Sequence, residues 1–277
     1  MQAYDLIAID IDGTLLNSQN TVSDSIIPLL RAVEAQGTGI TLISGRPALT
    51  VGPLIQELGL HLPYVSSGGA QITDATTGKH IASFALQRAE VQALAELGRA
   101  VHGGLIAMET RTLYYEGSLE KLKLVHDAND ISMGSLETIK TRIIQVDDVV
   151  LASPTPLKFT ISDMPAILAK VEDQVKTSGL AVYSTYSSPV YLEFTSASTN
   201  KGHALQLLAE HLGITLARTL VIGDSPNDLS MFSVAGTAIA MGNAMPQIKS
   251  AAHLIAPSND EDGVAWVLRE IVLQRGE

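Results

Sequence analysis

Short apolar runs alternate with longer amphipathic stretches toward both ends of this 277-residue chain. Near the N-terminus, this pattern predicts strands over residues 4–10 and 39–44 and helices over 22–36 and 47–58. Near the C-terminus, it predicts helices over 201–212, from 226, over 245–252 and over 262–273, with strands over 219–222, 237–241 and 254–256. Such alternation is typical of right-handed βαβ units, so both chain ends are expected to build one parallel sheet.

The middle of the chain has a different pattern. It predicts a hairpin over 71–86, a helix over 87–101, strands over 105–116 and 157–162, a helix over 165–178 and a strand pair near 181–195. Strands and helices mix here as in α+β domains. We therefore predict two domains: an α/β core formed by residues 1–82 and 190–277, and an inserted α+β domain formed by residues 83–189.

Composition and charge exclude several classes of function. A hydrophobic fraction of 46% with 17% charged residues indicates a folded chain, and its net charge of −11, without a basic stripe, disfavours binding to nucleic acid or anionic membranes. Without cysteine, the chain has neither disulfides nor thiolate metal ligands. We find no secretory leader and no apolar run of about 18 residues. We therefore expect a soluble, cytoplasmic protein; its oligomeric state stays unknown.

Two aspartates, Asp10 and Asp12, follow the first predicted strand. Residues i and i+2 of an extended chain share a face, so both carboxylates point the same way at the carboxyl end of this strand, where open α/β sheets bind ligands. Held close together, they must share a proton or a cation. Gly13 allows a tight turn after them, and Thr14 adds a hydroxyl. The alternative is that the pair merely caps the strand end or a turn.

Two further signals fall at predicted helix starts. Ser44 and Gly45 end the second strand just before a helix, whose free N–H groups favour an anion, although Ser44 as a simple helix cap explains the stretch equally well locally. Lys201 lies in the first turn of a predicted helix, where its charge opposes the macrodipole. Its charge is therefore expected to meet an anion; the alternative is a solvated surface lysine.

The stretch GDSPND, residues 223–228, follows the predicted strand 219–222. Ser225 and Asp228 have the spacing of a capping box, and Pro226 suits the first helical position. These local roles leave Asp224 unexplained. Its carboxylate lies directly at a strand end, again at the carboxyl edge of the predicted sheet.

In this order, the four signals resemble the motifs of the haloacid-dehalogenase-like (HAD) superfamily of phosphotransferases. DIDGTLL (residues 10–16) resembles the first motif, Ser44 the second, Lys201 the third, and GDSPND the fourth. The insertion between the second and third motifs, together with Asn200-Lys201-Gly202, is similar to the Cof-like branch with a type IIB cap. The resemblance spans essentially the whole chain and implies a Rossmann-like parallel-sheet core with an inserted α+β cap.

The resemblance also implies a mechanism. Asp10 would attack phosphorus and form an aspartyl-phosphate, and Asp12 would act as general acid and then general base. Mg²⁺ would be bound by Asp10, by Asp224 and by the backbone carbonyl of Asp12. Lys201 and Ser44 would stabilise the phosphoryl charge. The remaining site residues are Ile11, Gly45 and Asn227 at the phosphate, Asp228 orienting the lysine or metal-bound waters, and Gly13 and Thr14 in support.

The function that we expect is Mg²⁺-dependent hydrolysis of a small phosphorylated metabolite, with a sugar phosphate as the substrate class. A phosphomutase on the same fold is one alternative; a bisphosphate-primed conversion of sugar 1-phosphate to 6-phosphate would distinguish it. A phosphometabolite sensor that binds without turnover is another alternative, to be distinguished by calorimetry.

One position departs from the family pattern. Relatives commonly carry Ser-Asn-Gly-Ala after the third strand, whereas this chain reads Ser67-Gly68-Gly69-Ala70, so Gly68 stands where asparagine is usual. This puts the polar contact of the family in doubt, and we interpret the glycine pair as a tight turn. Candidates for contacting the leaving group from the cap are Arg111, Tyr114, Tyr115, Lys121 and Lys123.

Overall fold

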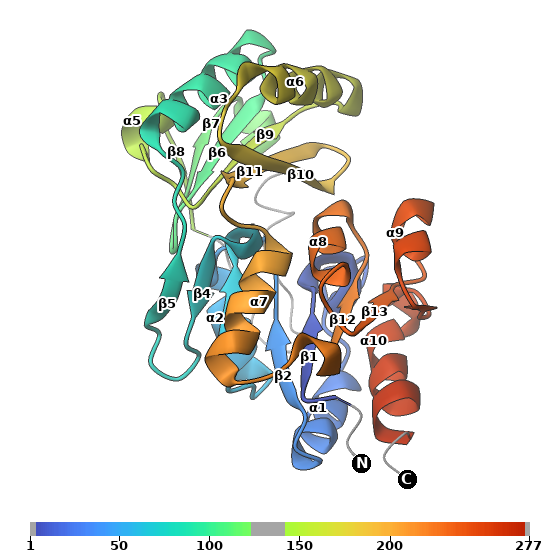
Figure 1. The fold of residues 1–277 in the computed structure, drawn as a ribbon. Coiled ribbons are helices and arrows are strands. Elements are labelled where there is room, and N and C mark those ends of the chain that lie inside the picture. The colour runs from blue at the N-terminus through green and yellow to red at the C-terminus, as the bar shows by residue number, and fades with distance from the viewer. Residues whose placement is uncertain (1–3, 123–141, 275–277) are drawn as a thin grey trace.

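The computed structural model describes residues 4–122 and 142–274, and its lower half in Figure 1 is built on a parallel sheet. The strand order is β14-β13-β12-β1-β2, and every neighbouring pair is parallel. The strands are β1 (Leu6–Ile9), β2 (Gly39–Leu42), β12 (Thr219–Gly223), β13 (Thr237–Ala240) and β14 (Leu254–Ile255). Both ends of the chain contribute strands, which confirms the predicted parallel-sheet core.

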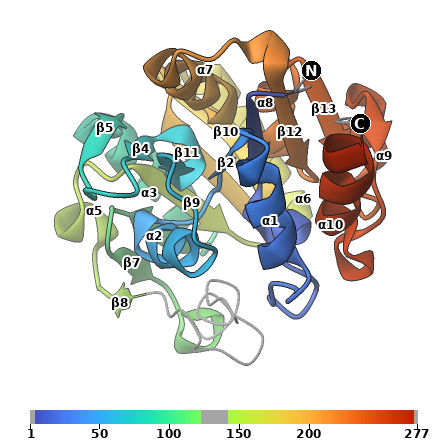
Figure 2. The ribbon, with the colours of Figure 1, turned by 90° about the horizontal axis from the view of Figure 1, so that it is seen from below.

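Helices cover both faces of this sheet because successive side chains of its strands point to opposite faces. On β1, Ile7 and Ile9 pack into one apolar cluster and Leu6 and Ala8 into the other. The first face carries α1 (Ile26–Ala35), α2 (Ala48–Glu57) and α10 (Gly263–Trp266), which continues as a wider helical turn over Val267–Leu273. The second carries α7 (Lys201–Leu212), α8 (Leu229–Phe232) and α9 (Pro246–Ala251), and Figure 2 shows α1 and α7 on opposite sides of the sheet.

A small antiparallel sheet packs against the core beside α2 and α7. It contains β3 (Tyr64–Ser66), β4 (Gln71–Thr73) and β5 (His80–Ser83), so the predicted hairpin over 71–86 is confirmed. The Asp74 carboxylate orders the hairpin loop, because its Oδ1 accepts hydrogen bonds from the backbone N–H groups of Thr76 and Thr77.

The inserted region forms a cap of mixed α and β structure at the top of Figure 1. Its sheet has the order β10-β11-β9-β6-β7-β8, in which β7 and β8 are parallel and the other pairs antiparallel. The strands are β6 (Gly104–Met108), β7 (Leu113–Glu116), β8 (Ile143–Gln145), β9 (Lys158–Ser162), β10 (Val182–Ser188) and β11 (Tyr191–Ser196). The helices α3 (Arg88–Ala100), α5 (Val149–Ala152) and α6 (Pro165–Ser178) pack against it through one apolar cluster.

The predicted single strand over 105–116 is wrong. The chain forms two antiparallel strands there, β6 and β7, and reverses where the N–H of Glu109 bonds to the carbonyl of Thr112. The polar residues of this turn interrupt the apolar pattern, which explains the break. At the other end of the cap, β11 lies beyond the predicted boundary at residue 190 yet pairs with the cap strands. The two-domain boundaries themselves stay a prediction.

The helices within the described ranges fall short of the length and apolar character that a membrane crossing requires.

Candidate active site

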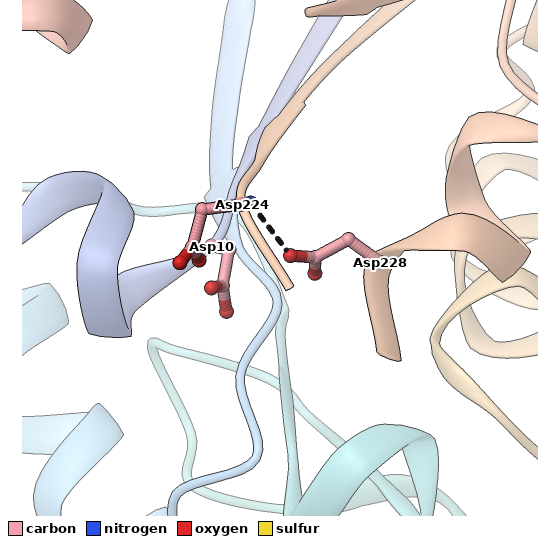
Figure 3. Close-up of side chains that lie close together, drawn as sticks. All are labelled: Asp10, Asp224 and Asp228. Carbon is pink, nitrogen blue, oxygen red and sulfur yellow. Dashed lines mark hydrogen bonds between the residues drawn. The ribbon is translucent and has the colours of Figure 1, made fainter. Parts of the chain in front are cut away.

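The pairing of β1 with β12 brings two of the predicted acids together. The two strands are parallel and in register, and the N–H of Asp10 donates to the carbonyl of Ile222 at 3.0 Å. Asp10 follows β1 and Asp224 follows β12, so both carboxylates leave the sheet at the same edge. With Asp228, they form a cluster in which one oxygen of each carboxylate lies within 4.8 Å of the others (Figure 3).

Lys201 neutralises part of this acidic cluster. It is the first residue of α7, and the Asn200 side chain caps the helix by accepting the N–H of His203 at 2.9 Å. The Lys201 side chain is 1% exposed, and its Nζ donates to Asp10 Oδ1 and to Asp228 Oδ1, both at 2.6 Å. Lys201 is therefore not a solvated surface lysine: two carboxylates offset its unfavourable interaction with the helix dipole.

Asp228 connects the lysine to the loop after β12. Its Oδ2 accepts the backbone N–H groups of Asp224 at 2.9 Å and of Ser225 at 3.0 Å; Figure 3 shows the bond to Asp224. The predicted capping box of Ser225 and Asp228 is confirmed. One buried carboxylate thus caps a turn and holds the lysine, which fixes the relative positions of three site residues.

Burial and crowding shift the pKa values in this cluster. Burial and then the Asp228 charge raise the pKa of Asp10, against the opposing effect of Lys201. The same two causes raise the pKa of Asp224 to about 7. Burial alone would lower the pKa of Lys201, but Asp10 and Asp228 outweigh it and raise the pKa, so the ammonium stays charged. Two carboxylates therefore share one ammonium, and the Asp224 carboxyl group lies beside them.

A divalent cation fits this donor set. Hard cations such as Mg²⁺ are bound by carboxylate oxygens, and a cation would oppose the burial and the repulsion that raise the pKa values of Asp10 and Asp224. The structure groups Asp10 and Asp224 with Asp228. The predicted ligand set contained the backbone carbonyl of Asp12 in place of the Asp228 carboxylate.

Asp12 is bound by a residue to which the sequence analysis assigned no role, Arg46. The arginine is 3% exposed, whereas the Asp12 side chain is 45% exposed. Arg46 Nε lies 3.0 and 3.1 Å from the two Asp12 carboxylate oxygens, and Nη2 lies 2.7 Å from Oδ1. A guanidinium fork of this kind fixes both the position and the orientation of a carboxylate. Arg46 directly follows Ser44 and Gly45 in the sequence, and this position could have identified it as a site residue.

Two further predicted residues of the first motif, Gly13 and Thr14, lie next to Asp224. Thr14 Oγ1 donates to Asp224 Oδ1 at 3.3 Å. Gly13 adopts a φ of +71°, and a Cβ there would collide with the Asp224 carboxylate. Ile11 is fully buried in the core. The first motif therefore packs directly against the fourth.

Ser44 and Asn227 differ in their access to the cavity, because Asn227 lines it and Ser44 does not. Ser44 is fully buried, and its Oγ accepts the N–H of Arg46 at 3.1 Å, which orders the turn before α2. Asn227 accepts a hydrogen bond from Ser225 Oγ at 2.9 Å and lines the cavity described next, as does Gly45. Among these residues, Asn227 and Gly45 are thus accessible to a ligand in this conformation.

A cavity of about 180 Å³ separates the core acids from the cap sheet. Its cap side contains Lys158 and Glu193, which are buried and joined by a contact of 2.6 Å between Nζ and Oε1. Sequence reasoning missed both, because each is a single charged residue within an otherwise unremarkable strand. The lining residues are Asp10, Asp12, Gly45, Arg46, Ile106, Met108, Leu113, Lys158, Thr160, Ser187, Ser188, Tyr191, Glu193, Ser225 and Asn227.

The cap candidates from the sequence were wrong wherever the structure describes them. Tyr115 is fully buried inside the cap, Tyr114 packs against the apolar cluster under α3 and α6, and Lys121 pairs with Asp163 at 3.5 Å. Arg111 lines a separate hollow beside α2 and the β4–β5 loop. The sequence pattern around these candidates did not reveal which face of the cap sheet meets the core. Lys123 lies outside the described residues.

The glycine pair after β3 forms the predicted turn. Gly68 has a φ of +71° and Gly69 one of +105°, values in the left-handed region that favours glycine. A Cβ at Gly68 would lie 3.6 Å from Thr195 Cγ2 and 3.9 Å from Lys158 Cδ. The position usually held by asparagine therefore lies directly against the cap residues over the cavity.

Known proteins share both the sequence pattern and the fold. The chain is 31% identical over 292 residues to the 5-amino-6-(5-phospho-D-ribitylamino)uracil phosphatase YwtE of Bacillus subtilis, covering 96% of this chain and 97% of that protein. It is 28% identical over 298 residues to the phosphatase YwpJ of the same organism, covering 96% and 99%. The solved HAD subclass IIB sugar phosphatase BT4131 has the same fold, with a TM-score of 0.81, 22% identity and coverage of 96% and 98%.

These comparisons agree with the resemblance that the four motifs carried. The sequence model of the haloacid dehalogenase-like hydrolases matches residues 7–268, which is most of the chain. The match includes all four motifs and the inserted cap, and several relatives of similar length are named phosphatases. The chain therefore belongs to the haloacid dehalogenase-like hydrolase family, as a phosphatase with a subclass IIB fold.

Proposed function

We propose that this phosphatase hydrolyses a small phosphomonoester, with a sugar phosphate as its substrate class, through an aspartyl-phosphate on Asp10 and with Mg²⁺ as cofactor. The observation that carries the proposal is the buried Asp10 carboxylate, fixed by Lys201 next to Asp224 at the edge of a cavity. A carboxylate in this position is a suitable nucleophile for phosphorus.

Asp10 has one oxygen held and one available. Oδ1 accepts the bond from Lys201, whereas Oδ2 receives no hydrogen bond from any residue in the described ranges. In the proposed first step, an Asp10 oxygen forms a bond to phosphorus as the bond from phosphorus to the leaving oxygen breaks. Lys201 stabilises the negative charge that carboxylate and phosphate bring together.

Asp12 supplies the proton transfers in this proposal. Its carboxyl group would protonate the leaving oxygen in the first step and accept a proton from water in the second, when water attacks the phosphoryl group on Asp10. Arg46 holds the Asp12 carboxylate through both oxygens at the cavity wall. Arg46 is therefore a positioning residue for the acid and base.

Asp10, Asp224 and either Asp228 or the backbone of Asp12 would hold Mg²⁺. When bound, this cation supplies positive charge between the carboxylates and the anionic phosphate. Without such charge, a substrate phosphate would approach a cluster of three acids and one lysine. The proposed cofactor would favour the ionised carboxylates, against the burial and the Asp228 charge that raise the pKa values of Asp10 and Asp224.

The size and lining of the cavity support a small metabolite as substrate. Its volume of about 180 Å³ is below the roughly 300–1,000 Å³ of drug-sized sites, which favours a small leaving group. The hydroxyls of Thr160, Ser187 and Ser188 line it. YwtE is named for a phosphate ester on a ribityl chain, which supports a polyhydroxylated substrate. We propose neither nucleic acid nor membrane as a partner; a cytoplasmic location stays a prediction.

Phosphate release with Mg²⁺ tests the function. We expect the wild-type protein to hydrolyse p-nitrophenyl phosphate and members of a sugar phosphate panel, and acid-quenched protein to carry one covalent phosphoryl group by intact-mass measurement. Asp10→Asn should remove both signals. Asp5→Asn is the matched control, because Asp5 lies at the opposite end of β1 and pairs with Arg218. A wild type without Mg²⁺-dependent release, or an active Asp10→Asn protein, would overturn the proposal.

A further inference from the structure

A buried ion pair in the cap faces the acids across the cavity. Lys158 begins β9, Glu193 lies on the adjacent strand β11, and their side chains are 3% and 7% exposed. Lys158 Nζ donates to Glu193 Oε1 at 2.6 Å and to the backbone carbonyl of Gly45 in the core at 2.7 Å. Both residues line the cavity. A buried ion pair contributes little stability on balance, so stability alone is a weak reason for this pair.

The pair keeps hydrogen-bonding capacity for a ligand. An ammonium has three N–H donors, and contacts within the described residues engage two of those on Lys158. Glu193 Oε1 accepts from Lys158 and from Ser187 Oγ at 2.8 Å, whereas Oε2 receives no bond from the described part of the chain. Ser188 Oγ, also in the cavity lining, is buried without a partner there. A donor, an acceptor and a hydroxyl therefore remain to be satisfied.

The charge of the pair discriminates between leaving groups. Among the described residues on the cap side of the cavity, one ammonium and one carboxylate balance, so they offer no excess positive charge to a second anion. A carboxylate or second phosphate on the substrate would meet Glu193 in a poorly solvated site, at a large cost. Neighbouring hydroxyls can accept from Lys158 and donate to Glu193 at the same time. The nearby walls of Ile106, Met108 and Leu113 are apolar and offer no compensation.

We infer that Lys158 and Glu193 select the leaving group: they bind neighbouring hydroxyls of a neutral polyhydroxylated substrate and reject phosphomonoesters that carry a second anionic group. The inference rests on the proposed function and names the residues that determine its specificity. Lys158 supplies a donor and Glu193 an acceptor, while Asp10 and Asp12 act on the phosphate at the opposite side of the cavity.

A purely structural role for the pair makes a different prediction. Lys158 also joins the cap to the loop that carries Ser44 and Arg46, through the carbonyl of Gly45. If the pair served only to hold the cap against the core, its loss would affect every substrate by the same factor. Selectivity between substrates therefore separates recognition from mechanical closure.

The test compares kcat/KM for three substrates in wild type, Lys158→Met and Glu193→Gln. Sorbitol 6-phosphate has a neutral polyol leaving group, p-nitrophenyl phosphate has no hydroxyl to bind, and 2-phosphoglycolate has a carboxylate. We expect both variants to lower the ratio of sorbitol 6-phosphate to p-nitrophenyl phosphate by about 10- to 100-fold, the effect of a lost hydrogen bond to a charged group. Glu193→Gln should raise the ratio of 2-phosphoglycolate to p-nitrophenyl phosphate by about 10-fold, because it removes the repelling charge.

Matched controls use the pair of Lys176 and Glu172 on α6, which lies outside the cavity and whose side chains are 57% and 21% exposed. Lys176→Met and Glu172→Gln should leave both ratios within about 2-fold of wild type. If a single cavity variant does not fold, the double variant Lys158→Met with Glu193→Gln removes both charges and leaves none unpaired. It should show the same fall in the polyol ratio.

Equal losses on all three substrates, or ratios unchanged from wild type, would overturn the inference. These outcomes are distinct from failure of the proposed function. If the proposed function fails, the wild type lacks Mg²⁺-dependent phosphate release or Asp10→Asn remains active. If only the specificity inference fails, the wild type is active and Asp10→Asn is not.

Discussion

The two sides of the cavity both bury a lysine against carboxylates, yet their charges differ. On the core side, Lys201 lies 2.6 Å from both Asp10 and Asp228, with Asp224 beside them. On the cap side, Lys158 lies 2.6 Å from Glu193. Counting the residues that the structure describes, the core side has more acids than bases, whereas the charges of the cap side balance. An excess of buried acid favours a bound cation or a retained proton, whereas a balanced pair can bind neutral hydroxyls.

The strongest test of this contrast is the loss of each lysine. Lys201→Met should lower kcat by about 10³-fold or more, because it removes charge stabilisation at the reacting phosphate. It should also lower the free energy of unfolding by about 3–5 kcal/mol, since Asp10 and Asp228 remain buried without their partner. Phosphate release and urea denaturation measure the two effects. If Lys158→Met reduced hydrolysis of p-nitrophenyl phosphate as severely, the two lysines would not differ in role.

The core side could be predicted from sequence because its residues follow strand ends. Asp10 and Asp224 come directly after β1 and β12, and parallel neighbouring strands end at the same edge of the sheet. Lys201 was conspicuous because a lysine in the first turn opposes the helix dipole. Each residue thus has a local feature that ordinary capping leaves unexplained. The place of Asp228 beside the other two acids was less evident, because its capping function already explained it.

The cap side could not be predicted in this way. Lys158 and Glu193 belong to antiparallel strands, lie 35 positions apart in sequence, and meet only when β9 pairs with β11. Their neighbours on each strand are apolar or small polar residues, so nothing local indicates which face meets the core. The unpredicted reversal between β6 and β7 also changed which cap residues face the cavity. Recognition residues therefore needed the tertiary structure.

Metal removal tests the charge excess directly. Chelation by EDTA should lower turnover by about 10³-fold, because the cation contributes several kcal/mol of charge stabilisation, and added Mg²⁺ should restore it. Mg²⁺ at about 100 times its Kd should also raise the free energy of unfolding by about 2.7 kcal/mol. Calorimetric titration and thermal unfolding measure binding. Asp224→Asn should weaken both effects, whereas Glu193→Gln should leave Mg²⁺ binding intact; equal weakening by both would contradict the contrast.

Arg46 sharpens the comparison because it lies at the cavity wall between the two sides. Arg46→Lys keeps the charge but loses the fork that holds both Asp12 oxygens, so we expect kcat for a sugar phosphate to fall by about 10-fold. A smaller loss is expected for p-nitrophenyl phosphate, whose leaving group needs little protonation. Steady-state kinetics on both substrates provide the readout. A larger loss for p-nitrophenyl phosphate would show that Arg46 does not act through Asp12.

The smallest expected effect is at Gly68, where the core turn meets the cap. A Cβ there would make ordinary contacts with Thr195 and Lys158, so backbone conformation rather than space determines the cost. At a φ of +71°, Gly68→Ala should lower the free energy of unfolding by about 1 kcal/mol, and Gly68→Asn by less, because asparagine tolerates the left-handed region. Urea denaturation measures both variants. If Gly68→Asn lowers the free energy of unfolding more than Gly68→Ala does, contact with the cap residues outweighs the backbone preference at this turn. Glycine would then replace the usual asparagine because Lys158 needs the space.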